Sequence, residues 1–341
     1  MNTMTEAVLG IDIAKNKFDV VLLIGGRRRR KTFANSRSGH AHLLQWLRDK
    51  GVTFSHACME ATGRYWEALA MQLHDGGHLV SVVNPSQVKN FARSKLTRNK
   101  TDSVDADLVA EFCLLLKPLR WSPPSPAKRR LRDLVRLREP LLASLIEYRN
   151  RLGEGTLFSP ASDALGRIID ALEDELASIE RAIREQIAAC PMLATEITLL
   201  TSIPGIGVMT AAGILVELPD ISLFRAAKQV AAYAGLSPRN RQSGSSILGP
   251  GRLARTGNAN LRSLLYLPAL AALRFNPVIK AFADNLRSKA RLAPKQIVAA
   301  AMRKLLHLCF GVLKNAQPFN PNQPAGRQQR AILSPDACAT A

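Results

Sequence analysis

The chain has 341 residues, of which 47% are apolar, and its 47 Lys and Arg against 27 Asp and Glu give a net charge of +20. This composition excludes a wholly disordered protein, and no signal peptide or run of about 18 apolar residues predicts export or a membrane span. The charge favours nucleic acid as the partner over a membrane surface, and five scattered cysteines without CxxC spacing fit a reducing cytoplasm and no zinc or disulfide framework.

Residues 1–122 predict an α/β domain with a mixed sheet, because expected strands alternate with expected helices. A β-hairpin is expected over residues 7–24, and the basic run Arg27, Arg28, Arg29, Arg30 and Lys31 leads into a third extended segment. Its arginines are candidate contacts to nucleic acid, RNA above all, and a solvated charge run is the alternative. The other expected elements are helices over 42–50 and 65–75, strands over 54–59 and 79–83, and a helix that begins near Thr101.

A Pro-rich segment, residues 121–126, marks the end of this domain. Residues 128–152 and 164–189 then show helical periodicity. The second run has a nearly heptad apolar seam of Leu165, Ile168, Ile169, Leu172, Leu176, Ile179, Ile183 and Ile187. We therefore expect residues 123–190 to form a helical coiled-coil region that folds as a hairpin. Such a hairpin could serve either as a spacer within the chain or as a contact between subunits of an oligomer.

Residues 191–316 predict a third, mainly α domain, followed by a disordered tail over 317–341 that is rich in Pro, Asn, Gln and Ala. Its clearest motif is the turn Pro204-Gly205-Ile206-Gly207 between two short helices. A helix-hairpin-helix turn of this kind directs backbone N–H groups of Gly205 and Gly207 at a DNA phosphate. The alternative is a tight corner between helices that binds nothing.

Four carboxylates in the first domain are candidate metal ligands. Asp12 interrupts the apolar strand Val8–Ile13, where a carboxylate costs several kcal/mol unless it is paired or metal-bound. Glu60 ends a later strand, and Asp102 and Asp105 lie three residues apart on one face of a helix. Oxygen ligands of this kind favour Mg²⁺ or Mn²⁺, and several acids from separate elements suit two-metal phosphoryl transfer.

The segment from Pro238 to Ser246 reads as a polar, glycine-containing loop in which Arg239 and Arg241 precede Ser243. Arginines hold phosphate, but a serine hydroxyl is a weak nucleophile, so the residues alone favour a phosphate-binding or flexible loop. The glycine-rich stretch that follows adds Arg252 and Arg255 as candidate backbone contacts to nucleic acid.

Five motifs in this order resemble the DEDD insertion-sequence transposases related to the Piv-type DNA invertases. They are GIDIAK (10–15), MEATG (59–63), NKTDSVDADLVA (99–110), IPGIG (203–207) and AGLSPRNRQSGSS (234–246). The resemblance implies a RuvC-like, ribonuclease-H-type first domain, a coiled-coil region and a helical transposase domain. It also implies that Asp12, Glu60, Asp102 and Asp105 bind Mg²⁺ and that Ser243 forms a covalent link to DNA.

The same resemblance implies donor and target DNA as substrates, a non-coding bridge RNA as guide, and dimers that assemble into a tetramer. Two other functions remain open. A RuvC-like junction-resolving nuclease would share the four acids but needs no serine. A non-enzymatic nucleic-acid-binding protein would use only the basic runs and the helix-hairpin-helix turn.

Overall fold

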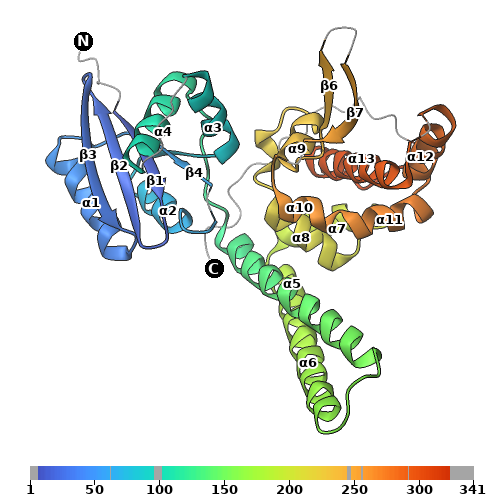
Figure 1. Cartoon of the computed structure of the whole chain (residues 1–341). Helices are drawn as coiled ribbons and strands as arrows, with labels where there is room; N and C mark the ends of the chain where they lie inside the picture. The colour runs from blue at the N-terminus through green and yellow to red at the C-terminus, as the bar shows by residue number, and fades with distance from the viewer. Residues whose placement is uncertain are drawn as a thin grey trace. The chain divides into compact units, whose positions relative to one another are not determined.

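The computed structural model describes residues 7–61, 63–95, 102–243, 247–254, 256–290 and 292–322, with the side chains of 102–104, 239–243, 247–252 and 289–290 excepted. The chain divides into two compact units, residues 1–123 and 124–341, and the division falls in the Pro-rich segment. The second unit includes both the helical hairpin and the C-terminal helices (Figure 1). The separation of residues 123–190 from 191–316 as distinct domains stays a prediction.

The first unit is built on a mixed sheet whose strand order is β3-β2-β1-β4-β5. Its strands are β1 (Val8–Ile13), β2 (Lys17–Ile24), β3 (Arg27–Ala34), β4 (His56–Glu60) and β5 (Leu79–Val83). Strands β1, β2 and β3 pair antiparallel, whereas β4 pairs parallel with both β1 and β5. The expected α/β organisation with a mixed sheet is therefore confirmed.

Helices cover both faces of this sheet (Figure 1). They are α1 (Arg37–Asp49), α2 (Glu67–Asp75), α3 (Pro85–Ser94) and α4 (Asp102–Leu116). One core contains Leu9, Ile11 and Phe18 of the sheet with the apolar residues of α1 and α2, and the other packs Val8 and Cys58 against α3 and α4.

Helix α3 was not predicted from the sequence, which indicated only that Asn84-Pro85 ends β5. These two residues also begin α3, because the Asn84 side chain accepts a hydrogen bond from the backbone N–H of Ser86 at 2.9 Å and Pro85 occupies the first helical position.

The second unit starts with the long helices α5 (Pro126–Gly153) and α6 (Ala161–Ala188), which pack on each other as a hairpin. Near the base of this hairpin, Leu131, Val135, Ile179 and Ile183 join the core of the C-terminal helices. Farther out, Leu145, Leu165, Ile169 and Leu176 form a small core of their own.

The C-terminal helices surround one apolar core, which is the largest of the chain's described residues. They are α7 (Pro191–Thr201), α8 (Val208–Glu217), α9 (Ala227–Tyr233), α10 (Ala259–Leu264), α11 (Tyr266–Phe275), α12 (Pro277–Ala290) and α13 (Pro294–Asn315), with a 3₁₀ turn over Ile221–Leu223. By length and composition alone α13 is apolar enough to cross a membrane, a test that a buried core helix also passes.

Two parts of the second unit differ from the sequence prediction. The segment predicted as a polar loop, together with the glycine-rich stretch after it, forms the antiparallel strands β6 (Pro238–Ser243) and β7 (Ile247–Leu253). The packed chain also continues beyond Gln317, where the tail was predicted to begin, because Phe319 packs on the core and its N–H donates to Ser202 Oγ at 2.8 Å. Residues 323–341 of that tail lie outside the described residues.

Candidate active site

Strand β1 places Asp12 on the face of the sheet that α4 covers. Side chains alternate along a strand, so Val8, Gly10 and Asp12 share one face, while Ile11 and Ile13 lie in the opposite core. The backbone of α4 passes directly over this face, since a Cβ on Gly10 would lie 2.2 Å from the carbonyl oxygen of Ala106 and 2.3 Å from the nitrogen of Ala110. Only glycine permits so close an approach of the helix to the strand.

The parallel register of β1 and β4 brings Glu60 beside Asp12. Gly10 pairs with Cys58 and Ile11 with Met59, so the next residues of the two strands are Asp12 and Glu60. Residues in register on neighbouring strands leave the same face, and the strands are about 4.8 Å apart. Two carboxylates therefore meet at the C-terminal ends of the two central strands.

The direction of α4 brings its first residues to the same end of the sheet. Near its C-terminus, Cys113 Sγ lies 3.6 Å from the carbonyl oxygen of His56, at the start of β4. Ala110 and Ala106 lie at the level of Gly10, midway along β1. The helix thus runs from the level of Asp12 and Glu60 back toward the strand starts, and its N-terminal end carries Asp102 and the half-buried Asp105.

These four positions supply oxygen ligands only, which is the donor set that Mg²⁺ and Mn²⁺ prefer. Within the described residues no three Asp, Glu, His or Cys side chains converge tightly enough to hold a metal ion, and the Asp102 side chain lies outside them. The chemistry of the donors and their placement at one end of the sheet fit a divalent cation.

Asp19, which the sequence alone marks as an ordinary surface or hairpin acid, lies on the same face. Asp19 of β2 is directly opposite Asp12 in the antiparallel register and therefore points to the side that α4 covers. Its carboxylate accepts a hydrogen bond from Thr32 Oγ1 and lies 3.5 Å from Lys17 Nζ. The sequence signal for Asp19 is the hairpin turn Ala14–Lys17, which is closed by a hydrogen bond from the Ala14 N–H to the Lys17 carbonyl oxygen. Asp12 and Asp19 lie two residues before and after this turn and are therefore paired.

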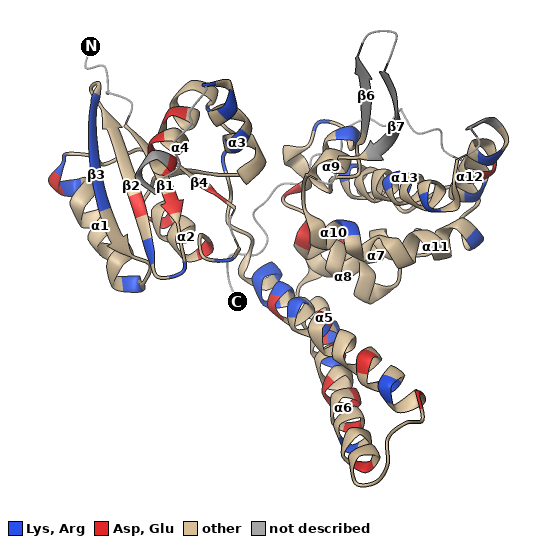
Figure 2. Ribbon diagram, in the orientation of Figure 1, with Lys and Arg blue, Asp and Glu red and all other residues tan. Residues whose placement is uncertain are grey.

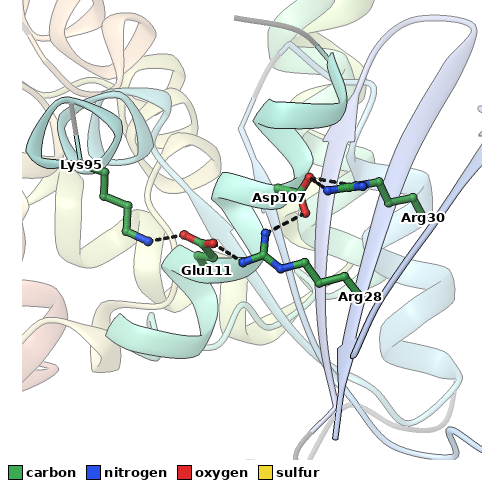
Figure 3. A network of polar contacts seen from close by, with 5 residues as sticks. All are labelled: Arg28, Arg30, Lys95, Asp107 and Glu111. Atoms are coloured by element: carbon green, nitrogen blue, oxygen red, sulfur yellow. Dashed lines mark hydrogen bonds and ion pairs between the residues drawn. The ribbon is translucent and has the colours of Figure 1, made fainter. Parts of the chain in front are cut away.

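The basic run forms β3 itself, and its members point to opposite sides of the sheet. Arg28 and Arg30 face α4, where they form ion pairs with Asp107 and Glu111 (Figure 3). Arg27 and Arg29 alternate with them and are exposed on the other face. Two of the four arginines predicted to contact nucleic acid are thus engaged within the protein.

Ser243 is the last residue of β6 and pairs with Ile247 of β7, so it lies at the end of a β-hairpin. Arg239, Arg241 and Arg252 also belong to this hairpin; their side chains, like that of Ser243, lie outside the described residues, as does Arg255 altogether. The acids belong to the first unit and the serine to the second.

A part-buried polar cluster that the sequence did not predict joins the segment before this hairpin to the segment after it. Asn258, which caps α10, donates from Nδ2 to Glu217 Oε2 at 2.8 Å, and Arg136 Nε of α5 donates to Glu217 Oε1 at 3.1 Å. The backbone N–H of Asn258 donates to the carbonyl oxygen of Tyr233 at 2.7 Å, beside the start of β6. At Gly257 a Cβ would lie 2.3 Å from that same oxygen.

The turn Pro204-Gly205-Ile206-Gly207 connects α7 and α8, and its two glycines have different surroundings. Gly205 has a φ of +102° and lies against α11, where a Cβ would be 2.9 Å from the nitrogen of Ala272. Internal packing therefore explains Gly205. Gly207 precedes the first turn of α8, and no described atom lies within 4 Å of where its Cβ would be.

The strand order and the carboxylates at the ends of the central strands fit a DEDD-type enzyme, and comparison with known proteins gives its class. A DEDD transposase model of the IS110 type matches residues 9–155, and a model of the Transposase IS116/IS110/IS902 family matches residues 197–284. The chain belongs to this IS110 family of transposases, whose DEDD domain implies a RuvC-like fold for the first unit.

Several relatives match over most of their length. The pilin gene-inverting protein of Moraxella bovis is 34% identical over 320 residues, which cover 93% of this chain and 98% of that protein. The transposase for insertion sequence element IS1111A of Coxiella burnetii is 28% identical over 298 residues, or 78% of each chain. A probable family 20 transposase of Pseudomonas aeruginosa is 27% identical over 358 residues, which cover 93% of this chain and all of that one.

Proposed function

We propose that this transposase cuts and exchanges DNA strands through a covalent link between Ser243 and DNA, assisted by Mg²⁺ or Mn²⁺ at Asp12, Glu60, Asp102 and Asp105. The observation that carries the proposal is the meeting of Asp12, Glu60 and the N-terminal end of α4 at one end of the sheet. A bound divalent cation would supply positive charge at the scissile phosphate and lower the pKa of a coordinated hydroxyl.

The proposed chemical step takes Ser243 as the nucleophile, as the family resemblance implies. Ser243 Oγ attacks the phosphorus in line, its proton passes to a neighbouring base, and the bond from phosphorus to one deoxyribose oxygen breaks. The departing strand end leaves as a hydroxyl group. Attack by a hydroxyl of the partner strand on the phosphoserine then joins the new strands and releases the serine, so the phosphodiester energy is conserved without ATP.

The placement of Ser243 at the end of a hairpin, rather than within the helical core, supports this role. Its neighbours in β6, Arg239 and Arg241, bring positive charge to the strand that a phosphate would approach. The polar cluster of Glu217 and Asn258 fixes the base of the hairpin, as precise delivery of a nucleophile requires.

The partners we propose are donor and target DNA and, from the family resemblance, a bridge RNA whose base pairing selects the sites. Residues 191–322 carry sixteen Lys and Arg against four Asp and Glu, which suits contacts to phosphate backbones. A dimer that assembles into a tetramer, with the α5–α6 hairpin as one contact, would bring several strands together. Buried free thiols at Cys58, Cys113, Cys190 and Cys309 suit a reducing cytoplasm, where the chromosome lies.

A covalent-trapping experiment tests the proposal. Purified protein is mixed with labelled junction and target DNA, Mg²⁺ and RNA from the flanks of its element, and run on a denaturing gel beside Ser243→Ala. We expect a protein–DNA adduct that requires Ser243, Asp12 and the metal. Cleavage without an adduct, unchanged in Ser243→Ala, would instead identify a hydrolytic junction-resolving nuclease. DNA binding that Asp12→Asn leaves intact, with no cleavage by either protein, would identify a non-enzymatic binder.

A further inference from the structure

Helix α4 carries acids on two separate faces. Asp105 lies on the face toward the ends of β1 and β4, as the contacts of Ala106 and Val109 with the sheet require, and the three-residue spacing predicts the same face for Asp102. Asp107 and Glu111, one helical turn apart, point instead toward the edge strand β3 (Figure 3). The second pair therefore lies outside the candidate metal site although it belongs to the same helix.

Asp107 and Glu111 are bound by cations from two other elements. Arg30 donates from Nε at 2.9 Å and from Nη2 at 2.6 Å to Asp107 Oδ2, and Arg28 donates from Nη2 to Glu111 Oε1 at 2.5 Å. Arg28 Nη1 also lies 3.6 Å from Asp107 Oδ1, and Lys95, which follows α3, pairs with Glu111 from the opposite side (Figure 3). The hydrogen bonds from Lys95 and Arg28 hold the pKa of Glu111 below its usual value.

Small residues form the apolar contact between this part of α4 and the sheet. Gly10, Ala106 and Ala110 meet there, beside Val21 of β2. Small side chains allow the helix to approach the strand closely, while the larger apolar residues of α4, Val109 and Phe112 among them, pack in the core with α3. The ion pairs at the edge of the helix supply the directional contacts that the small residues lack.

We propose that Arg28, Arg30 and Lys95 are positioning residues: through Asp107 and Glu111 they fix the rotation and axial position of α4, and thereby hold Asp105 and Asp102 against Asp12 and Glu60. The inference rests on the proposed metal site. It assigns the α4-facing half of the basic strand to the enzyme's own acids, and leaves Arg27, Arg29 and Lys31 of that run for an external polyanion.

The alternation of β3 offers a matched pair of variants. Arg28→Gln with Arg30→Gln removes both arginine contacts to α4, whereas Arg27→Gln with Arg29→Gln removes the same charge from the other face of the same strand. The readout is the dissociation constant of Mn²⁺ for the full-length protein without nucleic acid, measured by electron paramagnetic resonance. Thermal unfolding of each variant verifies that it is folded.

Loss of groups that orient metal ligands commonly lowers affinity 10- to 100-fold, and we expect the Arg28/Arg30 variant to bind Mn²⁺ about tenfold more weakly. The Arg27/Arg29 variant should bind it as the wild type does. Arg28→Lys with Arg30→Lys, which keeps both charges, should recover most of the affinity, a rescue that general loss of stability would not produce.

Unchanged Mn²⁺ affinity in the Arg28/Arg30 variant would overturn the positioning role, provided that Asp12→Asn abolishes Mn²⁺ binding by the otherwise wild-type protein. If the two double variants weakened Mn²⁺ binding equally, general electrostatics would replace positioning as the explanation. Failure of the proposed metal site itself has a different signature: Asp12→Asn would bind Mn²⁺ as tightly as the wild type.

Discussion

Gly10 determines how closely α4 can approach the sheet, and through it where the acids of the helix lie. A single methyl group at this position would meet backbone atoms of Ala106 and Ala110 at 2.2 and 2.3 Å, and backbone cannot rotate away as a side chain can. The helix would have to move outward from β1. Such a movement would also carry Asp105 away from Asp12.

We therefore expect Gly10→Ala to lower the free energy of unfolding of the first unit by about 3 kcal/mol, the upper end of ordinary overpacking. All three tryptophans, Trp46, Trp66 and Trp121, belong to this unit, so urea unfolding followed by tryptophan fluorescence reports on it alone. The rate of DNA strand transfer should also fall, because the outward movement of α4 separates Asp105 from Asp12.

The control is Gly166→Ala in α6, where no described atom lies within 4 Å of the new Cβ. Alanine favours a helix interior over glycine by about 1 kcal/mol, so this change should stabilise the hairpin and leave the fluorescence transition unmoved. A Gly10→Ala protein with wild-type stability would mean that α4 is not held as tightly as the structure indicates.

From the sequence alone, individual acids could be recognised as candidate ligands only where the local pattern around them is unusual. Asp12 stood out because a carboxylate in an apolar strand needs a partner, and Glu60 because it ends a strand. Asp19 was interpreted as an ordinary surface or hairpin acid, since its position opposite Asp12 depends on the hairpin register. The pairing of Asp107 and Glu111 with Arg28 and Arg30 joins residues about 80 positions apart, which no local pattern reveals.

At the scale of elements, the long helices were the easiest to predict. Six apolar residues of the predicted seam in α6 are buried, as a helix with one apolar face requires: Leu165, Ile169, Leu176, Ile179, Ile183 and Ile187. Ile168, also assigned to the seam, is 46% exposed, because the true period of the helix carries it out of the interface. The β6–β7 hairpin escaped prediction, since its Arg, Asn, Gln, Ser and Gly residues resemble a loop.

At the base of that hairpin, the two roles of Asn258, helix cap and hydrogen-bond donor to Glu217, predict different effects of one substitution. Asp is as good a helix N-cap as Asn, so a purely capping role for Asn258 predicts that Asn258→Asp is harmless. The Nδ2 contact to the buried Glu217 predicts the opposite, because a second carboxylate would replace the donor and repel Glu217.

We expect Asn258→Asp to lower the free energy of unfolding of the second unit by about 2 kcal/mol near neutral pH, measured by urea unfolding followed by circular dichroism. Adding Glu217→Gln should restore much of the loss, since the amide ends the repulsion. If Asn258→Asp were as stable as the wild type, Asn258 would act only as a helix cap, and its contact with Glu217 would not stabilise the base of the hairpin.

Over the whole chain, positive charge is distributed unevenly, and this distribution separates surfaces for nucleic acid from surfaces for protein. Residues 124–190, which contain the α5–α6 hairpin, carry eleven Lys and Arg and eleven Asp and Glu, and Figure 2 shows the two signs intermixed along both helices. A neutral, mixed surface suits contact with protein better than with a phosphate backbone. A polyanion would bind instead to the surface of residues 191–322, where Lys and Arg outnumber Asp and Glu.

The densest described part of that excess lies between α9 and α13. Lys228, Arg303 and Lys304 surround His307, and burial together with these three cations lowers its pKa. Lys304 also lies over the ring of Phe282, with 5.9 Å from its ammonium nitrogen to the ring centroid. No ion pair to Lys228, Arg303 or Lys304 occurs among the residues that the structure describes, so their charge is available to a phosphate backbone.

If these cations contact duplex DNA, Arg303→Ala with Lys304→Ala should weaken DNA binding without regard to sequence and make it less sensitive to salt. Each phosphate contact contributes about 0.9 to the slope of log K against log salt concentration, so the slope should become shallower by about 2. Titrations of a labelled duplex at several salt concentrations measure this directly. Arg151→Ala with Arg181→Ala removes two exposed charges from the neutral hairpin and should leave the slope as it is. Equal losses of slope in both double variants would show that DNA responds to net charge alone and that the α9–α13 surface is not its contact.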